Sequence, residues 1–240
     1  MNRDTNGVKF GAAAGWARVA FTKNILSFIA LAAVVMILQF GQQFAANPFT
    51  ETFSRCIEVG GAGSTLDAAA MSTCFESEMG SILLVILLAV VFVVASFLAT
   101  AGVIRGALYV TLGRKIGFAD TFTGPHFGAF ALTVLLIMVT FVAGLFLFIV
   151  PAIFAILLFQ FAPFFALDRG LPPFQALKSS TRLVRLNWPL AILVLLFSGA
   201  AYLISGLFWG IPTLLLLPLA ALVTGYVYRT LQGETVDPVL

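Results

Sequence analysis

The chain has 240 residues, of which 61% are apolar and only 10% are charged. Soluble domains usually carry about 45–50% apolar and about 25% charged residues. With a mean hydropathy of +1.08, the chain has too much apolar surface for one water-soluble core. The same composition excludes intrinsic disorder, a collagen-like fibre and a disulfide-rich secreted module, so a polytopic membrane protein remains.

Six uncharged apolar segments are long enough to cross a bilayer. A helix rises about 1.5 Å per residue, so about 20 residues span the hydrocarbon core. Helices are expected because lipid cannot satisfy free backbone groups, and no segment alternates as a membrane strand would. In chain order, the predicted spans are residues 25–45, 81–104, 127–149, 151–167, 189–209 and 211–228.

Two prolines separate neighbouring spans with almost no polar loop between them. Pro151 and Pro212 are therefore predicted to mark tight turns. The alternative is one long kinked helix in each case, but such a helix would be nearly twice the length that a bilayer needs. The segment after Lys23 is longer than a signal-peptide core of about 7–15 residues, which favours a retained first span. We expect an all-α helix bundle forming one integral membrane domain over residues 1–240.

Positive charges predict the orientation. Among the 13 Lys and Arg residues, only Arg55 falls on one side of the predicted spans. The positive-inside rule makes the other side cytoplasmic. Both termini are then cytoplasmic, which agrees with an even number of spans. The twelve cations expected on cytoplasmic connections are Arg3, Lys9, Arg18, Lys23, Arg105, Arg114, Lys115, Arg169, Lys178, Arg182, Arg185 and Arg229.

One long external loop is predicted over residues 47–80. It contains both cysteines, Cys56 and Cys74, and a disulfide is favoured because exported loops face an oxidising compartment. Free thiols or metal ligands are the alternative, although two thiolates without a histidine make a poor zinc site. The loop could attract a cation or a basic partner, but a solvated acidic loop is favoured. Its acids are Glu51, Glu58, Asp67, Glu76 and Glu78.

A basic amphipathic helix is predicted over residues 172–187 at the cytoplasmic surface. Lys178, Arg182 and Arg185 share one side at spacings of four and three, and apolar residues including Val184 occupy the other. This pattern is typical of a helix whose apolar side lies in the headgroup boundary. The three cations are the candidate contacts for anionic lipid headgroups. The simpler alternative, which the sequence favours, is an orientation anchor without lipid selectivity.

A second inner-surface helix is expected over residues 7–23. Gly7, Gly11 and Gly15 recur at four-residue spacing, which would give this helix a smooth face for close packing. Residues 113–125 occupy the equivalent place before the third span. The chain therefore reads as three units, each with an inner-surface segment followed by two spans.

The predicted spans lack groups that could perform ionic chemistry. They contain no Asp, Glu, Lys, Arg or His, and such residues usually mark proton relays and ion paths. Polar residues such as Gln160 are expected to bond neighbouring helices or their own backbone. Asp168 and Arg169 should form an exposed pair of little value. We therefore expect no catalytic residue, cofactor or metal site, with His126 the only histidine, and no nucleic-acid partner.

Residues 164–188, FFALDRGLPPFQALKSSTRLVRLNW, resemble the signature region of YciC-type bacterial inner-membrane proteins. They are similar also to the membrane domain fused to some glycerophosphoryl diester phosphodiesterases, and AGWARVAFTKN and GVIRGALYVTLGRKIGFADTF match the same pattern loosely. The resemblance rests mainly on Asp168-Arg169-Gly170, Pro173, Ala176-Leu177, Ser180, Arg185 and Asn187-Trp188. It implies about six helices in a bacterial plasma membrane, without a settled activity. The phosphodiesterase barrel has no counterpart here, so its activity is not carried over.

These observations predict a non-catalytic multi-pass protein of the bacterial plasma membrane. We expect an accessory or scaffold role in a membrane complex or in envelope-lipid handling. Anionic lipids on the cytoplasmic side are the expected partners, and other membrane proteins are further candidates. The alternative is a transporter for a neutral or lipid-like solute, which internal repetition and helix breaks near the two prolines would fit.

Overall fold

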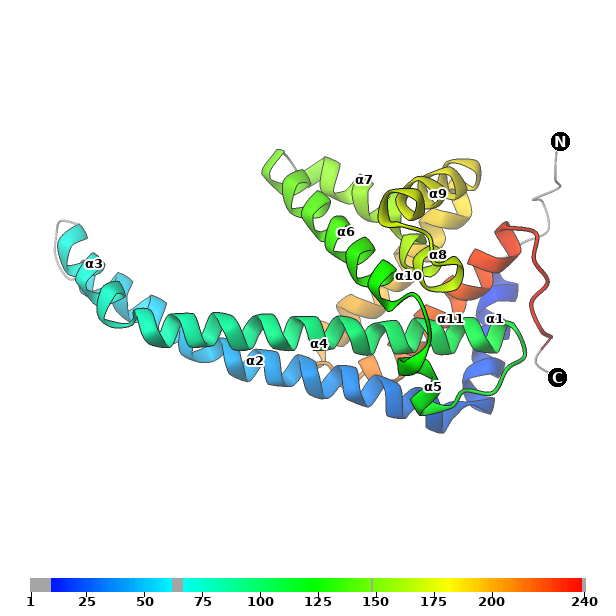
Figure 1. Cartoon of the computed structure of the whole chain (residues 1–240), viewed down its shortest axis with the longest axis horizontal. Helices are drawn as coiled ribbons and strands as arrows, with labels where there is room; N and C mark the ends of the chain where they lie inside the picture. The colour runs from blue at the N-terminus through cyan, green and yellow to red at the C-terminus, as the bar shows by residue number, and fades with distance from the viewer. Residues whose placement is uncertain (1–9, 62–66, 148, 239–240) are drawn as a thin grey trace. The chain divides into compact units, whose positions relative to one another are not determined.

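A computed structural model describes residues 10–61, 67–147 and 149–238. Every regular element in these ranges is an α-helix, and six helices are long and apolar enough to cross a membrane (Figure 1). The chain is thus an all-α, multi-pass membrane protein, as predicted. The candidate spans are Ile25–Gly61, Met79–Thr111, Phe127–Phe146, Val150–Arg169, Trp188–Leu207 and Thr213–Leu231.

A shorter helix precedes each pair of spans, which is the threefold organisation that the sequence suggested. The fourth span consists of two helices, α7 and α8, and α3 lies between the first two spans. The helices are α1 (Phe10–Lys23), α2 (Ile25–Gly61), α3 (Ala68–Ser77), α4 (Met79–Thr111), α5 (Phe118–Thr123), α6 (Phe127–Leu147), α7 (Ile149–Phe159), α8 (Ala162–Arg169), α9 (Pro173–Leu186), α10 (Trp188–Leu207) and α11 (Thr213–Leu231).

The chain divides into two compact units. Unit 1 comprises Met1–Val34 and Leu98–Leu240, and unit 2 comprises Val35–Phe97. Unit 1 therefore contains the last four spans with the three preceding short helices, and unit 2 contains the hairpin made by the facing parts of α2 and α4 with α3.

Helix α1 packs in unit 1 through alanines. It contacts α11 and α10, and Ala13, Ala17 and Ala20 are completely buried. The predicted glycine face is wrong for the described part of this segment, since Gly11 and Gly15 are exposed and a Cβ on either would meet nothing within 4 Å. Gly7 lies outside the described residues. The alanines already allow close approach, because their single methyl group is small.

The third span, α6, and the first helix of the fourth span, α7, are separate helices that pack closely, and they do not form one kinked helix. A Cβ placed on Gly144 would lie 2.9 Å from the backbone nitrogen of Ala152, so only glycine lets the α6 and α7 backbones approach this far. Pro151 lies within the first helical turn of α7, whereas the sequence predicted that it would lie in a tight turn between two spans. Pro212 does lie in a turn, as predicted, and is also the N-cap of α11. Proline suits a helix start because the first N–H groups have no intrahelical partner.

Polar residues in the spans of unit 1 mostly bond backbone carbonyls, as expected. The amide of Gln160, at the break between α7 and α8, donates to the carbonyls of Leu157 and Ala191 at 3.2 and 3.1 Å. The second bond ties this break to α10. Thr133 donates to the carbonyl four residues earlier in its own helix, as does Ser205.

The predicted external loop over 47–80 is largely helical, which corrects the expectation of a long loop. Helix α2 runs for 37 residues without ending at Pro48, so it is about 55 Å long against a hydrocarbon core of about 30 Å. Hydropathy shows where an apolar stretch ends, but the hydrogen-bonded helix continues beyond it. Within this region α3 is a separate short helix, whose N-cap Asp67 accepts from the backbone N–H groups of Ala69 and Ala70.

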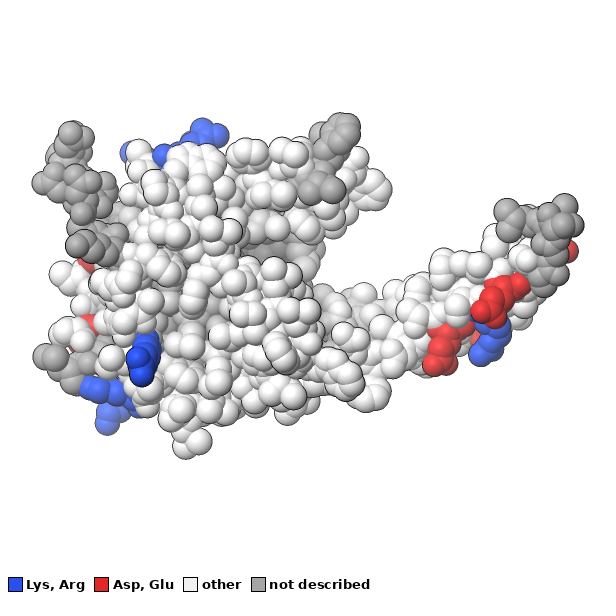
Figure 2. All heavy atoms as spheres, turned by 180° about the vertical axis from the view of Figure 1, so that it is seen from behind, with Lys and Arg blue, Asp and Glu red and all other residues white. Residues whose placement is uncertain are grey.

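A disulfide joins α2 to α3 in unit 2, as predicted. Cys56 and Cys74 are 18 residues apart in sequence and their Cα atoms lie 5.6 Å apart. Beside them, the ring of Phe53 contacts those of Phe49 and Phe75 at centroid distances of 5.9 Å. Cys56 is fully buried, so the bridge and the contact of Phe53 with Phe75 together hold α3 against α2. Figure 2 shows the acidic side chains gathered on this hairpin.

Removing the disulfide should loosen the hairpin alone. A C56S/C74S variant loses a cross-link that stabilises a loop of this size by roughly 3 kcal/mol in the chain-entropy model. We expect limited proteolysis to cut within residues 47–80 faster, while fragments from unit 1 persist. Reductant should reproduce the effect in the native chain and leave the variant unchanged; equal cleavage rates for both proteins would show that helix packing alone holds the hairpin.

Candidate functional site

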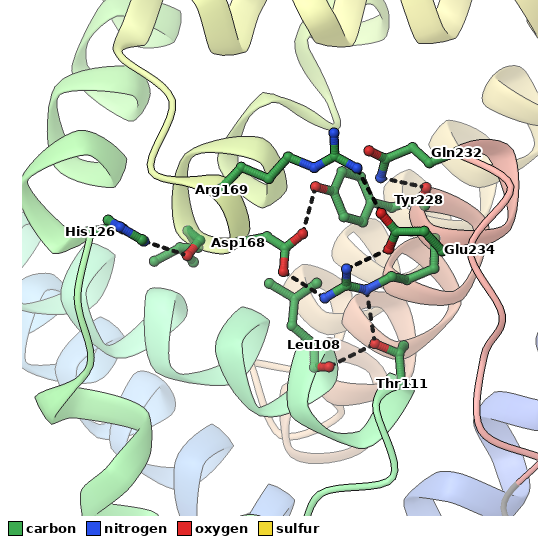
Figure 3. A network of polar contacts seen from close by, with 10 residues as sticks. Leu108, Thr111, His126, Asp168, Arg169, Tyr228, Gln232 and Glu234 are labelled. Carbon is green, nitrogen blue, oxygen red and sulfur yellow. Dashed lines mark hydrogen bonds and ion pairs between the residues drawn. The ribbon is translucent and has the colours of Figure 1, made fainter.

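The charged side chains of unit 1 fall into two groups. One group pairs within the protein, and the other has no charged partner. The largest paired set, here called the ionic cluster, consists of Asp168, Arg169, Tyr228, Arg229 and Glu234 (Figure 3). It joins the end of α8 to the last turn of α11 and to the segment that follows.

Arg229 lies at the centre of the ionic cluster and is 5% exposed. Its guanidinium donates to Asp168 Oδ1 at 2.5 Å and to Glu234 Oε2 at 2.6 Å. Arg169 donates to the other Glu234 oxygen at 2.7 Å, and the Tyr228 hydroxyl donates to Asp168 Oδ2 at 3.0 Å. Two cations thus face two carboxylates, and the cluster is electrically balanced without a ligand.

A glycine places the acidic end of the cluster. Gly170 ends α8 with φ +62° and its N–H bonds the Ala166 carbonyl at 3.1 Å. This left-handed conformation favours glycine, and a Cβ there would lie 2.5 Å from the His126 imidazole. Because α8 stops here, Asp168 and Arg169 stand in its last turn, where Asp168 reaches the end of α11 and Arg169 reaches the segment after it.

The expected exposed pair of Asp168 with Arg169 is wrong. Each residue bonds a different partner, since neighbours in a helix point about 100° apart and do not face each other. The prediction that Arg229 lies on an exposed connection is also wrong, because Arg229 lies inside α11 and is buried. Nothing in the sequence pairs residues 168 and 229; only the packing of α8 on α11 brings them together.

Arg105 is a second cation that the sequence placed on a connection and that is buried instead, with 3% exposed. Its guanidinium donates to the carbonyls of Thr121 and Pro125 and lies 4.3 Å from the Phe127 ring centroid. A cation is favourable at the carbonyl end of a helix. Arg105 therefore holds the end of α5 and the start of α6 onto α4.

The segment after α11 is fixed to the same end of unit 1. The Asp237 N–H donates to the Thr111 carbonyl at 3.0 Å, and the Trp16 indole donates to the Asp237 carbonyl at 2.7 Å. Gly113 has φ +69°, and a Cβ there would collide with the Asp237 carboxylate. Together with Glu234, these contacts attach the segment to α1, α4 and α8.

The ionic cluster also changes the acidity of Glu234. Partial burial opposes ionisation, but the hydrogen bond and charge of Arg229, followed by those of Arg169, outweigh it. The pKa of Glu234 therefore lies below its ordinary value of 4.5. A lowered pKa means that the carboxylate form is stabilised by folding, and that this stabilisation disappears when the group is protonated.

Helix α9 carries three of the cations that have no charged partner. Lys178, Arg182 and Arg185 are exposed, and within the described parts of the chain no ion pair or hydrogen bond occupies their charged groups. All three line one open groove of about 560 Å³. The structure thus brings the three predicted headgroup contacts together. The groove is lined by Phe159, Leu177, Lys178, Thr181, Arg182, Arg185 and Leu186.

The middle of the apolar side of α9 faces protein, which corrects the expectation that the whole side lies in the headgroup boundary; Phe174 and Trp188 at its two ends are exposed. Val184 is fully buried, and the Ser180 hydroxyl donates to the Leu158 carbonyl at 2.7 Å and accepts from the Phe161 N–H at 3.2 Å. Contacts with α6, α7 and α8 hold the helix in place (Figure 1). An amphipathic pattern requires an apolar neighbour but does not distinguish lipid from protein.

Comparison with known proteins identifies relatives without a known role. The chain is 34% identical over 137 residues to "Uncharacterized protein Rv2560" of Mycobacterium tuberculosis H37Rv and to "Uncharacterized protein Mb2590" of Mycobacterium bovis. Each match covers 57% of this chain and 42% of the relative, so it spans less than half of either relative. No family model matches the chain, and neither does a solved structure.

The ion pair at the centre of the cluster should be energetically coupled. D168N leaves the buried Arg229 with Glu234 as its one remaining carboxylate, and R229M removes the cation that pairs with Asp168. Breaking a buried ion pair in this way costs up to about 3–5 kcal/mol. We expect each single variant to lower the unfolding temperature in detergent strongly, and the double variant to lose less than the sum. R182M, which removes an exposed cation without a partner, should leave the unfolding temperature nearly unchanged. Additive losses in the double variant would contradict direct pairing.

Acid should release the segment after α11. Because the pKa of Glu234 is lowered in the folded state, its contribution is complete above the ordinary value of 4.5 and is lost as the pH falls through the lowered folded pKa. Trp16 fluorescence reports the attachment in a W188F/W209F background. We expect the fluorescence of the protein with Glu234 to change as the segment detaches in acid. E234Q should lack this transition, because its segment is already detached at neutral pH. An identical pH profile in E234Q would refute the assignment.

Proposed function

We propose that this protein is a non-catalytic accessory or scaffold of a bacterial plasma membrane that binds anionic lipid headgroups through α9. The observation that carries the proposal is the row of three exposed, unpaired cations along one groove with apolar walls. Anionic headgroups fit this combination, because they supply phosphate charge beside hydrocarbon. The YciC-type resemblance agrees with such a membrane setting.

The rigidity of α9 supports this function. Its buried face is fixed by Ser180 and Val184, so the cations stand on a helix that is already ordered before a lipid arrives. Binding then avoids the free-energy cost of folding the helix on the membrane. Each cation near an anionic leaflet adds about 1 kcal/mol of attraction, so three cations provide a useful affinity for the surface.

The position of α9 supports a membrane ligand over a soluble one. Asn187 alone separates α9 from α10, a candidate span that begins at Trp188. The groove therefore opens next to the end of a membrane helix. We propose that this end is cytoplasmic and that both termini lie there too, since Lys and Arg are concentrated on the connections at this side of the predicted spans. The mycobacterial relatives support a bacterial membrane.

The paired charges support a structural role for the ionic cluster and not a catalytic one. Its two carboxylates are already paired with two guanidinium groups, so neither is available to exchange a proton with a substrate, as an acid–base site requires. The transporter alternative gains no support from Gln160, because its amide donates to two backbone carbonyls. The geometry thus favours binding and scaffolding over transport.

Neutralising the row on α9 should reduce lipid binding selectively. We expect a K178Q/R182Q/R185Q variant in nanodiscs to retain about a hundredfold less phosphatidylglycerol than the native chain at low salt, because three headgroup attractions of about 1 kcal/mol each are removed. The measurement is quantitative mass spectrometry of lipid retained by the purified protein after exchange into gentle detergent.

A matched control separates the α9 row from general positive charge. R18Q/R114Q/K115Q also removes two arginines and one lysine, but from exposed positions outside the groove. Retention in this control should stay within about twofold of the native chain. Equal losses in both triple variants would mean that charge alone, and not the α9 groove, attracts the lipid.

A further inference from the structure

Resting on the proposed function, we propose that the α9 groove selects an amphiphile that carries two phosphate groups in one molecule. A bis-phosphodiester lipid and a lipid diphosphate share this chemistry. Three features of the groove lead to this ligand: the length and number of its cationic positions, the absence of a competing acid, and the apolar character of the rest of its lining.

The row of cations is longer than one phosphate. Lys178 and Arg185 are seven residues apart on one helix, which separates their backbone positions by about 10 Å along the axis, with Arg182 between them. A single phosphodiester carries one negative charge and reaches only part of this row. It would leave two of the three positive charges uncompensated, whereas two phosphates compensate most of the charge along the whole row.

The protein itself does not neutralise the row. The groove lining contains no Asp or Glu, in contrast to the ionic cluster, where each arginine faces a carboxylate. Thr181 supplies the only other polar side chain of the lining, and its hydroxyl already donates to the Leu177 carbonyl at 2.9 Å. The groove therefore distinguishes ligands by phosphate charge and offers no side-chain donor dedicated to a neutral headgroup alcohol.

The remaining lining requires an apolar part in the ligand. Phe159, Leu177 and Leu186 line the same groove as the cations, and the Leu186 side chain is largely exposed. Burying such groups against hydrocarbon is favourable by about 25 cal/mol per Å², and a free phosphate or diphosphate cannot provide that contact. A lipid with two phosphates supplies both the charge and the chain.

Covalent linkage of the two phosphates gives the selectivity. After one phosphate binds, the second is held near the remaining cation at a high effective concentration. Two separate monoanionic lipids lack this advantage, even when they bring the same total charge. At equal surface charge, the groove should therefore prefer the linked form, and the preference should disappear when the row is neutralised.

The experiment compares two membranes of equal surface charge. The full chain is placed in phosphatidylcholine nanodiscs with either cardiolipin or twice the mole fraction of phosphatidylglycerol, and retained lipid is quantified after exchange into gentle detergent. We expect at least about fivefold more cardiolipin retained per phosphate. K178Q/R182Q/R185Q should abolish the preference, whereas R18Q/R114Q/K115Q should keep it. Soluble inorganic diphosphate, added as a competitor, should displace cardiolipin only weakly.

Each of the other possible results of this experiment refutes a different part of the proposal. Equal retention of the two lipids would refute the two-phosphate selectivity while leaving anionic-lipid binding by α9 intact. Complete displacement by equimolar inorganic diphosphate would refute the role of the apolar lining and assign the groove to soluble phosphates. Retention of neither lipid by the native chain would refute the proposed function itself, and preference in both triple variants would place the selective site elsewhere.

Discussion

The neutralisation of Arg229 is the interaction on which the architecture of unit 1 depends. A guanidinium that is 5% exposed has lost most of its contact with water, so the fold must supply counter-charges. Asp168 from α8 and Glu234 from the segment after α11 supply them. The ends of two helices and the following segment are therefore fixed to one another by one cation, and α9 is placed by its packing against α8.

The contrast between satisfied and unsatisfied charges assigns roles within unit 1. The guanidinium groups of Arg105, Arg169 and Arg229 have carbonyl or carboxylate partners, so they stabilise the fold. The cations of α9 have none in the part of the chain that the structure describes, although their helix is among the best anchored in the unit. A rigid helix with unneutralised charge suits the lipid binding proposed for α9, because an anionic ligand would provide the missing charge without having to order the protein.

The hairpin of unit 2 is stabilised by a different kind of contact. Its helices continue beyond the length that a bilayer needs, so they must be held together by contacts other than lipid exclusion. The buried sulfur of Cys56, the bridge to Cys74 and the ring contacts of Phe53 provide such contacts. A disulfide suits the attachment of the ten-residue α3, since so short a helix buries little apolar surface by itself.

The amino-acid sequence alone determined the membrane class, the six spans and the cysteine pair, because hydropathy and residue separation are local properties. It also identified Lys178, Arg182 and Arg185, since helical periodicity places them on one side. It did not predict that α2 continues past Pro48, that α9 buries the middle of its apolar side in protein, or that Asp168 pairs with Arg229 instead of Arg169. Those outcomes depend on which helices pack together, and contacts between residues as distant as 168 and 229 exist only in the tertiary structure.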